Sequence, residues 1–243
     1  MDVPILTVLA IVFLAALVRA TFGFGDALLG MPLLALVVSM RFATPLMGFV
    51  GPTIAVALLV REWRHVDVKG ALALIVSTLA GIPFGLLFLK HVDEKAMNLV
   101  LALIIIGFAL YNLFRPGLLR LKSDRPAWAF GVVAGILGAA YNTNGPPVIL
   151  FGVLRGWKPE SFRATLQGYF LPTGAAILAG QGLAGMWSPA VVCTYLYALP
   201  LVVLAVVAGS RLAAKIPAAK FVRVVHVLML AVGIALLAKA AFG

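Results

Sequence analysis

Charged residues are scarce in this chain, and their scarcity excludes most classes of soluble protein. Only 11% of the 243 residues are Asp, Glu, Lys or Arg, whereas 63% are hydrophobic. A soluble domain carries roughly 25% charged residues, because water must solvate its surface. This chain has too few charges for such a surface, so lipid is the expected solvent. The composition predicts a polytopic membrane protein and excludes a soluble enzyme or a nucleic-acid-binding protein.

Cysteine and histidine are also nearly absent. The single cysteine, Cys193, cannot form a disulfide within one chain, and the 3 histidines have no spacing typical of a metal site. The sequence contains no nucleotide-binding motif and no recognisable Ser-His-Asp set. We therefore expect no metal, no cofactor and no enzymatic activity, and we expect that ATP is not the direct energy source.

Ten apolar runs, bounded by charge, glycine or proline, make up most of the chain. A helix that crosses a membrane needs about 20 residues, and the third to fifth and eighth to tenth runs reach that length. The first, second, sixth and seventh runs are shorter, and a glycine-containing break separates the members of each short pair. Such pairs are typical of interrupted or re-entrant helices. In chain order the runs are 5–18, 27–38, 42–60, 70–89, 96–114, 127–141, 145–154, 164–184, 188–210 and 221–237.

The order of the runs repeats, since each half reads short, short, long, long, long. We therefore predict one all-α transmembrane domain over residues 1–243, with a first repeat at about 1–114, a basic linker at 115–126 and a second repeat at about 127–243. Residues of the two halves align in two blocks, at offsets of 115 and 120 residues. The aligned residues are Gly23, Gly30 and Pro32 with Gly138, Gly145 and Pro147, then Leu46, Gly48, Pro52 and Thr53 with Leu166, Gly168, Pro172 and Thr173.

An odd number of runs in each half makes the second repeat enter the membrane from the opposite side. Loops rich in Lys and Arg stay in the cytoplasm, so the basic residues give the orientation. With the N-terminus outside, 14 basic residues fall inside, 4 fall outside and Arg19 lies within a helix. The sequence thus predicts inverted-topology repeats with both termini outside, as in many secondary transporters. The inside set is Arg61, Arg64, Lys69, Arg115, Arg120, Lys122, Arg125, Arg155, Lys158, Arg163, Arg211, Lys215, Lys220 and Arg223, and the outside set is Arg41, Lys90, Lys95 and Lys239.

The two breaks, residues 21–26 and 141–147, occupy the same place in their repeats. Interrupted helices near the middle of a membrane expose backbone N–H groups and positive dipole ends that favour an anion. Backbone polar groups cannot face hydrocarbon, so both breaks are expected to meet at the centre of the protein. The sequence therefore predicts a central anion site built from the two breaks.

Asp26 is the acidic residue that lies at a membrane break, whereas the other seven acids fall in predicted loops or at the terminus. A carboxylate at the bilayer centre costs about 2.5–3.5 kcal/mol on insertion scales, so it needs a compensating role. Asp26 either caps the helix that begins at Ala27 or carries a proton when the site is occluded. Arg19, one turn before the break, either extends to the cytoplasmic surface, meets an anionic substrate or pairs with Asp26.

The second break is polar without being charged. Residues 142–144 are consecutive polar residues in an apolar half, and we expect them to line the site and to cap the helix that starts at Gly145. Gln167 is a further contact candidate, whereas Thr53 and Thr173 follow prolines and are expected to hydrogen-bond their own helix backbone. The predicted substrate-binding residues are Arg19, Gly23, Gly25, Asn142, Thr143, Asn144, Gly145 and Gln167, and Asp26 is the predicted site of proton coupling.

A glycine-rich break followed by a short apolar run with proline, present twice in a chain of this length, resembles the TauE/SafE family of sulfite and organosulfonate exporters. The family more often carries consecutive glycines at the breaks, where this chain has residues 25–27 and 142–144. The resembling positions are Gly23, Gly25, Gly30 and Pro32 in the first half, and Gly135, Gly138, Gly145 and Pro147 in the second.

The resemblance implies a multi-pass secondary transporter of the cell membrane, in bacteria the inner membrane, that exports a small anion such as sulfite or an organosulfonate. A passive anion channel is an alternative, because the same breaks could form a pore. Uptake of a small organic anion is another alternative, because sequence fixes orientation but not the direction of flux. The expected partners are the anion and the lipid bilayer, and no nucleic acid.

Overall fold

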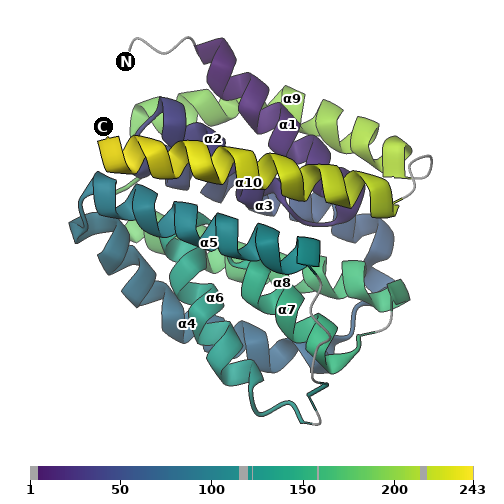
Figure 1. Cartoon of the computed structure of the whole chain (residues 1–243). Helices are drawn as coiled ribbons and strands as arrows, with labels where there is room; N and C mark the ends of the chain where they lie inside the picture. Colours follow the sequence, from purple (N-terminus) through teal and green to yellow (C-terminus); the bar gives the residue numbers. More distant parts are fainter. Residues whose placement is uncertain (1–4, 115–119, 122, 158, 214–217, 243) are drawn as a thin grey trace.

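The computed structural model describes residues 5–114, 120–121, 123–157, 159–213 and 218–242, and every regular element within them is a helix (Figure 1). The predicted all-helical fold is confirmed for these residues. The basic linker predicted at 115–126 lies partly outside them. In chain order the helices are α1 (Ile5–Phe22), α2 (Asp26–Val37), α3 (Met40–Glu62), the short 3-10 helix η1 (Trp63–His65), α4 (Val68–His91), α5 (Glu94–Phe114), α6 (Ala127–Tyr141), α7 (Gly145–Arg155), α8 (Pro159–Leu183), α9 (Pro189–Ala213) and α10 (Ala218–Phe242).

Six helices in the described part of the chain are long and apolar enough to cross a membrane, namely α1, α3, α4, α5, α9 and α10. The prediction that the first run is short was wrong, because α1 continues past Val18 to Phe22 and reaches 18 residues. The helix α8 is longer, at 25 residues, but carries Arg163, Gln167 and Gln181 along its length. The helices α2, α6 and α7 are short, with 12, 15 and 11 residues.

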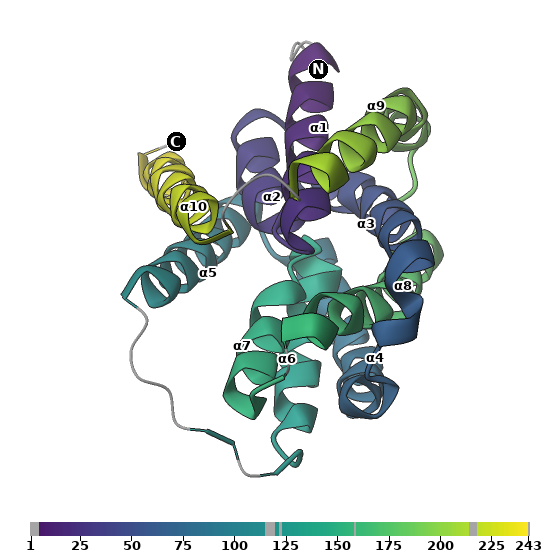
Figure 2. The ribbon, with the colours of Figure 1, turned by 90° about the vertical axis from the view of Figure 1, so that its right-hand side faces the viewer.

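The helices pair across the two halves of the chain. The helix α1 packs on α9 and α6 packs on α4, so the first helix of each half lies against the fourth helix of the other. The helices α3 and α8 form a third pair, and α5 and α10 form a fourth. The α5–α10 pair runs across the front of Figure 1, and Figure 2 shows it set to one side, away from α3, α4 and α8.

Glycines let α4 and α6 approach until their backbones touch. A Cβ atom added at Gly81 would lie 2.9 Å from the Ile136 nitrogen and 3.0 Å from Cα of Gly135. A Cβ atom added at Gly85 would lie 2.8 Å from Cβ of Ala139. Small residues of this kind allow close packing between membrane helices, where no hydrophobic force drives helices together.

We expect Gly81→Ala to lower the thermal midpoint of the detergent-solubilised protein. Alanine is ordinarily the better helix residue by about 1 kcal/mol, but here its methyl group would meet the α6 backbone, and overpacking typically costs about 1–3 kcal/mol. The matched control is Gly107→Ala on α5, where an added Cβ meets no atom within 4 Å. A Gly81→Ala midpoint equal to or above that of Gly107→Ala would contradict the packing argument.

Threonines follow two of the prolines inside the helices and hydrogen-bond the helix backbone. The hydroxyl of Thr53 donates to the carbonyl of Phe49 at 2.9 Å, and that of Thr173 donates to the carbonyl of Tyr169 at 2.7 Å. Pro52 and Pro172 interrupt the same helices one residue earlier. The prediction that both threonines hydrogen-bond their own helix backbone is confirmed.

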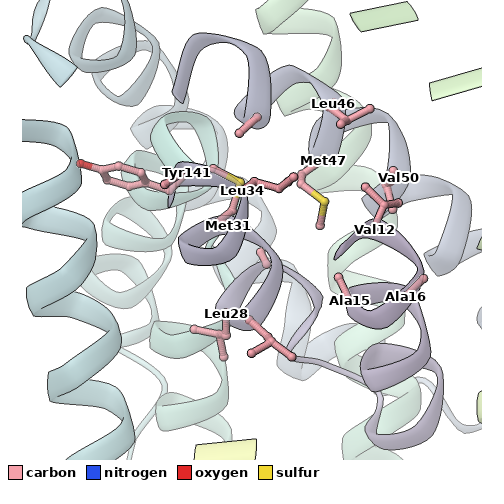
Figure 3. Packing of buried hydrophobic residues seen from close by; sticks show 14 of the residues in the cluster. Val12, Ala15, Ala16, Leu28, Met31, Leu34, Leu46, Met47, Val50 and Tyr141 are labelled. Atoms are coloured by element: carbon pink, nitrogen blue, oxygen red, sulfur yellow. The ribbon is translucent and has the colours of Figure 1, made fainter. Parts of the chain in front are cut away.

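Two clusters of buried hydrophobic residues hold the helices together. The first joins mainly α1, α2, α3, α5, α9 and α10, and the second joins mainly α4, α6, α7 and α8. Tyr141, the last residue of α6, belongs to the first cluster together with Met31 and Leu34 (Figure 3). Its hydroxyl donates to the carbonyl of Met97 at 3.1 Å. The end of α6 is therefore fixed against helices of the other half.

Candidate functional site

A small cavity lies where the two hydrophobic clusters meet, and both breaks line it. Its volume of ≈ 30 Å³ is enough for a water molecule. The predicted meeting of the two breaks is confirmed by this shared lining. The lining residues are Arg19, Phe24, Gly25, Asp26, Ala27, Leu28, Met47, Gly51, Pro52, Asn142, Thr143, Asn144, Gly145, Pro146, Ile149, Phe170, Gly174 and Ile177.

The first break depends on two glycines. Gly23 and Gly25 have φ angles of +87° and +102°, a region that glycine enters without steric penalty and that other residues rarely adopt. The N–H of Gly23 donates to the carbonyl of Arg19 at 2.6 Å and closes the end of α1. Gly25 occupies the N-cap position of α2, so Asp26 is the first residue of that helix. The chain thus reverses within three residues and presents the start of α2 to the cavity.

Arg19 is the one basic side chain in the described wall of the cavity. Its side chain is only 5% exposed, and Nη1 lies 2.8 Å from Oδ2 of Asp26. The other terminal nitrogen, Nη2, donates to Oε1 of Gln167 at 3.1 Å. The guanidinium carbon lies 4.8 Å from the ring centroid of Phe170, in the geometry of a cation–π contact. Arg19 is therefore held between a carboxylate, an amide and an aromatic face.

The helix α8 holds the first break in place from outside the cavity. Nε2 of Gln167 donates to the carbonyl of Gly23 at 2.5 Å. Arg163, one turn earlier, donates to the carbonyls of Ala20 at 2.9 Å and Thr21 at 3.3 Å. A cation at these last carbonyls satisfies groups that have no partner within α1 and complements its negative dipole end.

The second break has an asparagine where the first has glycine. Asn142 has a φ angle of +52°, and its N–H donates to the carbonyl of Gly138 at 2.7 Å. Its side-chain amide donates to the carbonyl of Thr44 on α3. Asn144 occupies the N-cap position of α7, but its side chain donates to Oγ1 of Thr173 at 3.4 Å and makes no capping bond.

The cavity wall combines one positive and one negative side chain with two helix N-termini. The dipole of a helix places roughly half a positive charge at its N-terminus. Asp26 offsets this charge at α2, whereas no acidic residue follows in the first turn of α7. Pro146 and Pro147 have no N–H, so the start of α7 offers few backbone donors to a ligand. Arg19 and the side-chain amides are consequently the strongest anion-binding groups of the cavity.

Most of the predicted site residues come together. Arg19, Gly25, Asp26, Asn142, Thr143, Asn144 and Gly145 line the cavity, whereas Gly23 and Gln167 do not line it but contact each other and support it. The alternative prediction that Arg19 extends to the membrane surface was wrong, because Arg19 pairs with Asp26 in the interior. The alternative prediction that Asp26 caps the helix was also wrong, because Gly25 occupies the N-cap position of α2 and no side chain caps this helix.

Three contributors were absent from the predicted site. Arg163 was assigned to a cytoplasmic loop, but it lies in α8 and contacts the end of α1. Phe170 and Gly51 face Arg19 from α8 and α3. Residues 163, 167, 170, 174 and 177 follow the spacing of one helix face, and this periodicity is the signal that could have identified them.

Comparison with known proteins gives a family match and one relative. The profile of the family described as Sulfite exporter TauE/SafE matches residues 8–236. The chain is also similar to a protein of Cupriavidus necator described as "Probable sulfite/organosulfonate exporter TauE". The two are 25% identical over 181 residues, which cover 73% of this chain and 71% of that protein. No solved structure matches the chain.

Proposed function

The chain belongs to the sulfite exporter TauE/SafE family, and on this premise we propose that it exports sulfite or a small organosulfonate through the cavity between the two breaks. The membership makes it a multi-pass membrane transporter. The observation that carries the more specific proposal is the buried Arg19, whose guanidinium faces both breaks and the start of α2. A guanidinium with a planar fork of N–H groups is well suited to the oxygen atoms of a sulfite or sulfonate.

The ion pair between Arg19 and Asp26 suggests how the anion and a proton move together. An incoming anion competes with the Asp26 carboxylate for Nη1 of Arg19, which lies 2.8 Å from Oδ2. A carboxylate that loses its cation beside an anion is stabilised by taking up a proton. Anion and proton then occupy one site at the same time. Their charges cancel, so the loaded site can change its access without carrying net charge across the membrane. Net flux follows the combined gradients of anion and proton, so export requires an outward anion gradient that exceeds any inward proton gradient.

Two inverted-topology repeats, residues 1–114 and 127–243, are part of this proposal. The packing of α1 on α9 and of α6 on α4 supports it, because the first helix of each half packs on the fourth helix of the other. A second observation is that Arg163 donates to the carbonyl of Ala20 and Thr44 donates to that of Ala140 at 3.1 Å. Each donor lies in the third helix of one half, and each acceptor lies in the last turn of the first helix of the other half. Repeats of this kind allow a transporter to alternate its access by moving one group of helices against the other.

A passive anion channel is the competing function. The described cavity is narrow and is lined in part by buried side chains, including Met47 and Ile177, which are each 1% exposed. A cavity this narrow favours a carrier, in which helices must move to admit an anion, over an open pore. Both termini are proposed to lie outside, because the loops richest in Lys and Arg would then be cytoplasmic.

We expect Asn142→Gly to weaken anion binding about tenfold. Glycine keeps the φ angle of +52° accessible while it removes the side-chain amide, so the substitution separates ligand contact from backbone strain. A lost hydrogen bond to a charged group is worth about 1.5 kcal/mol or more. Dissociation constants measured from ligand-dependent thermal midpoints give the comparison, with Gly107→Ala as control. Unchanged affinity in Asn142→Gly would show that this amide serves only the bond to Thr44.

The experiment that tests the proposed function is a thermal-shift series on the purified protein. A ligand that binds only the folded state raises the midpoint, and the rise grows with the logarithm of its concentration relative to its dissociation constant. Sulfite and methanesulfonate are expected to raise the midpoint, whereas chloride is expected to leave it unchanged. A rise with chloride equal to the rise with sulfite would contradict a site built for sulfur oxyanions.

A further inference from the structure

The α3–α8 interface contains a second buried polar group, Gln181, at the end of α8 away from Arg19. Gln181 is 0% exposed, and neither Oε1 nor Nε2 has a hydrogen-bond partner among the described residues. Its backbone carbonyl accepts from the N–H of Met186, five residues later, a bond typical of a helix end, and α8 ends at Leu183. A buried amide with no partner lowers stability and calls for an explanation, because an apolar residue of the same size would fill the space at no such cost.

Gln181 continues the helix face that lines the cavity. Gly174 and Ile177 of α8 belong to the cavity wall, and Gln181 follows Ile177 by four residues, or about 6 Å along the helix. On the opposite side, its amide lies over Gly48 of α3, where an added Cβ would be 3.2 Å from Cδ and 3.5 Å from Nε2. Gly48 directly follows Met47, which also lines the cavity.

Two flexible apolar side chains of the cavity wall, Met47 and Ile177, lie next to Gly48 in the chain and one helical turn before Gln181, respectively. A Cβ added at Gly30 would lie 3.4 Å from the Met47 methyl carbon, and one added at Gly138 would lie 2.7 Å from the Ile177 Cδ1. Met47 and Ile177 thus extend towards α2 and α6, the helices that flank the two breaks. Methionine has three rotatable bonds and adapts to neighbouring movement, so these side chains can change conformation without disturbing the backbone.

We propose that Gln181 is a second contact for the transported anion, on the path that leads from the central cavity past Met47 and Ile177. This inference rests on the proposed function. The Nε2 amide offers two N–H donors to an oxyanion, and an uncharged donor binds weakly enough to release it. In the proposed topology Gln181 lies on the outer half of the membrane, so it receives the anion after Arg19 during export.

The first test replaces the amide without changing the size of the side chain. Gln181→Met is expected to reduce the rate of methanesulfonate transport in proteoliposomes about tenfold. Its thermal midpoint should be equal to or above that of the wild type, because an unpartnered polar group is removed. Its affinity for methanesulfonate at the central cavity should stay within twofold of the wild type. The control is Leu101→Met, a volume-conserving change at a site that is 0% exposed in the first hydrophobic cluster.

The second test does not depend on transport. A Gln181→Cys variant is made with Cys193→Ser, because Cys193 is the exposed native thiol. The negatively charged reagent 2-sulfonatoethyl methanethiosulfonate is expected to label this thiol from outside intact cells and to leave a Leu101→Cys thiol unlabelled. Labelling together with slowed Gln181→Met transport supports the proposal.

Either of two results overturns it, namely transport by Gln181→Met within twofold of the wild type, or a Gln181→Cys thiol that resists labelling from both faces of membrane vesicles. If the wild type moves no sulfonate, the proposed function fails instead. Labelling at position 181 then decides alone whether this residue faces a path for small anions.

Discussion

Replacing Arg19 with glutamine is expected to reduce sulfonate transport at least about 100-fold and to destabilise the protein. The guanidinium is the one full positive charge in the described cavity wall. Hydrogen bonds to a charged group are worth about 1.5–3 kcal/mol each, and 1.4 kcal/mol corresponds to a tenfold change in binding. The substitution also leaves the Asp26 carboxylate buried without its partner, which typically costs about 3–5 kcal/mol of folding free energy.

A double substitution separates the two effects. Arg19→Gln combined with Asp26→Asn removes both charges, so the thermal midpoint should recover most of what Arg19→Gln loses. Transport should not recover, because the cation that receives the anion is still absent. Arg19→Lys keeps the charge but cannot reach both Asp26 and Gln167 with a planar fork, and intermediate transport is expected. Normal transport by the double variant would mean that Arg19 only neutralises Asp26.

The second large effect is expected at Asp26. Asp26→Asn should retain anion binding but abolish the dependence of transport on a proton gradient, because an amide does not take up a proton at the pH of the assay. Removal of the competing carboxylate from Arg19 should also raise the anion affinity, since the anion no longer displaces a charged partner. Initial rates of methanesulfonate uptake with and without a proton gradient provide the measurement. Methanesulfonate stays ionised across the pH range of the assay, whereas the charge of sulfite changes with pH.

The control for Asp26 is a second ion-paired aspartate outside the cavity. Asp124 lies 2.6 Å from Arg155, and its side chain is 67% exposed. Asp124→Asn should leave both the rate and its pH dependence unchanged, because exposed ion pairs contribute little. If Asp26→Asn shows the pH dependence of the wild type, the aspartate serves only to neutralise Arg19, and the proton is carried elsewhere or not at all.

The breaks were predictable from sequence because their signals are local. The glycines at 23 and 25 and the prolines after Gly145 lie beside polar residues in otherwise apolar runs, and the structure places helix ends at Phe22 and Tyr141. The first helix was predicted four residues too short for a related reason. Arg19 read as the polar end of an apolar run, but a buried partner lets the helix continue through it.

The contacts that complete the site could not be predicted in this way. Arg19 and Gln167 are 148 residues apart, and Arg163 and Ala20 are 143 residues apart. Which residues of α8 meet α1 depends on how the helices pack, and packing is set by many small contacts rather than by any one motif. The choice among three roles for Arg19 stayed open for the same reason, because only the fold shows that Asp26 lies within reach.

The most direct test of the central claim is concentrative uptake into proteoliposomes that contain the purified protein. A proton gradient, acidic outside, is imposed while potassium and valinomycin hold the membrane potential at zero, and radiolabelled methanesulfonate is followed inside. We expect methanesulfonate to accumulate above its external concentration with the wild type and to equilibrate with Asp26→Asn. Equilibration without accumulation in the wild type, at a rate equal to that of Asp26→Asn, would identify a passive channel and contradict a carrier in which the anion and the proton share the Arg19–Asp26 site.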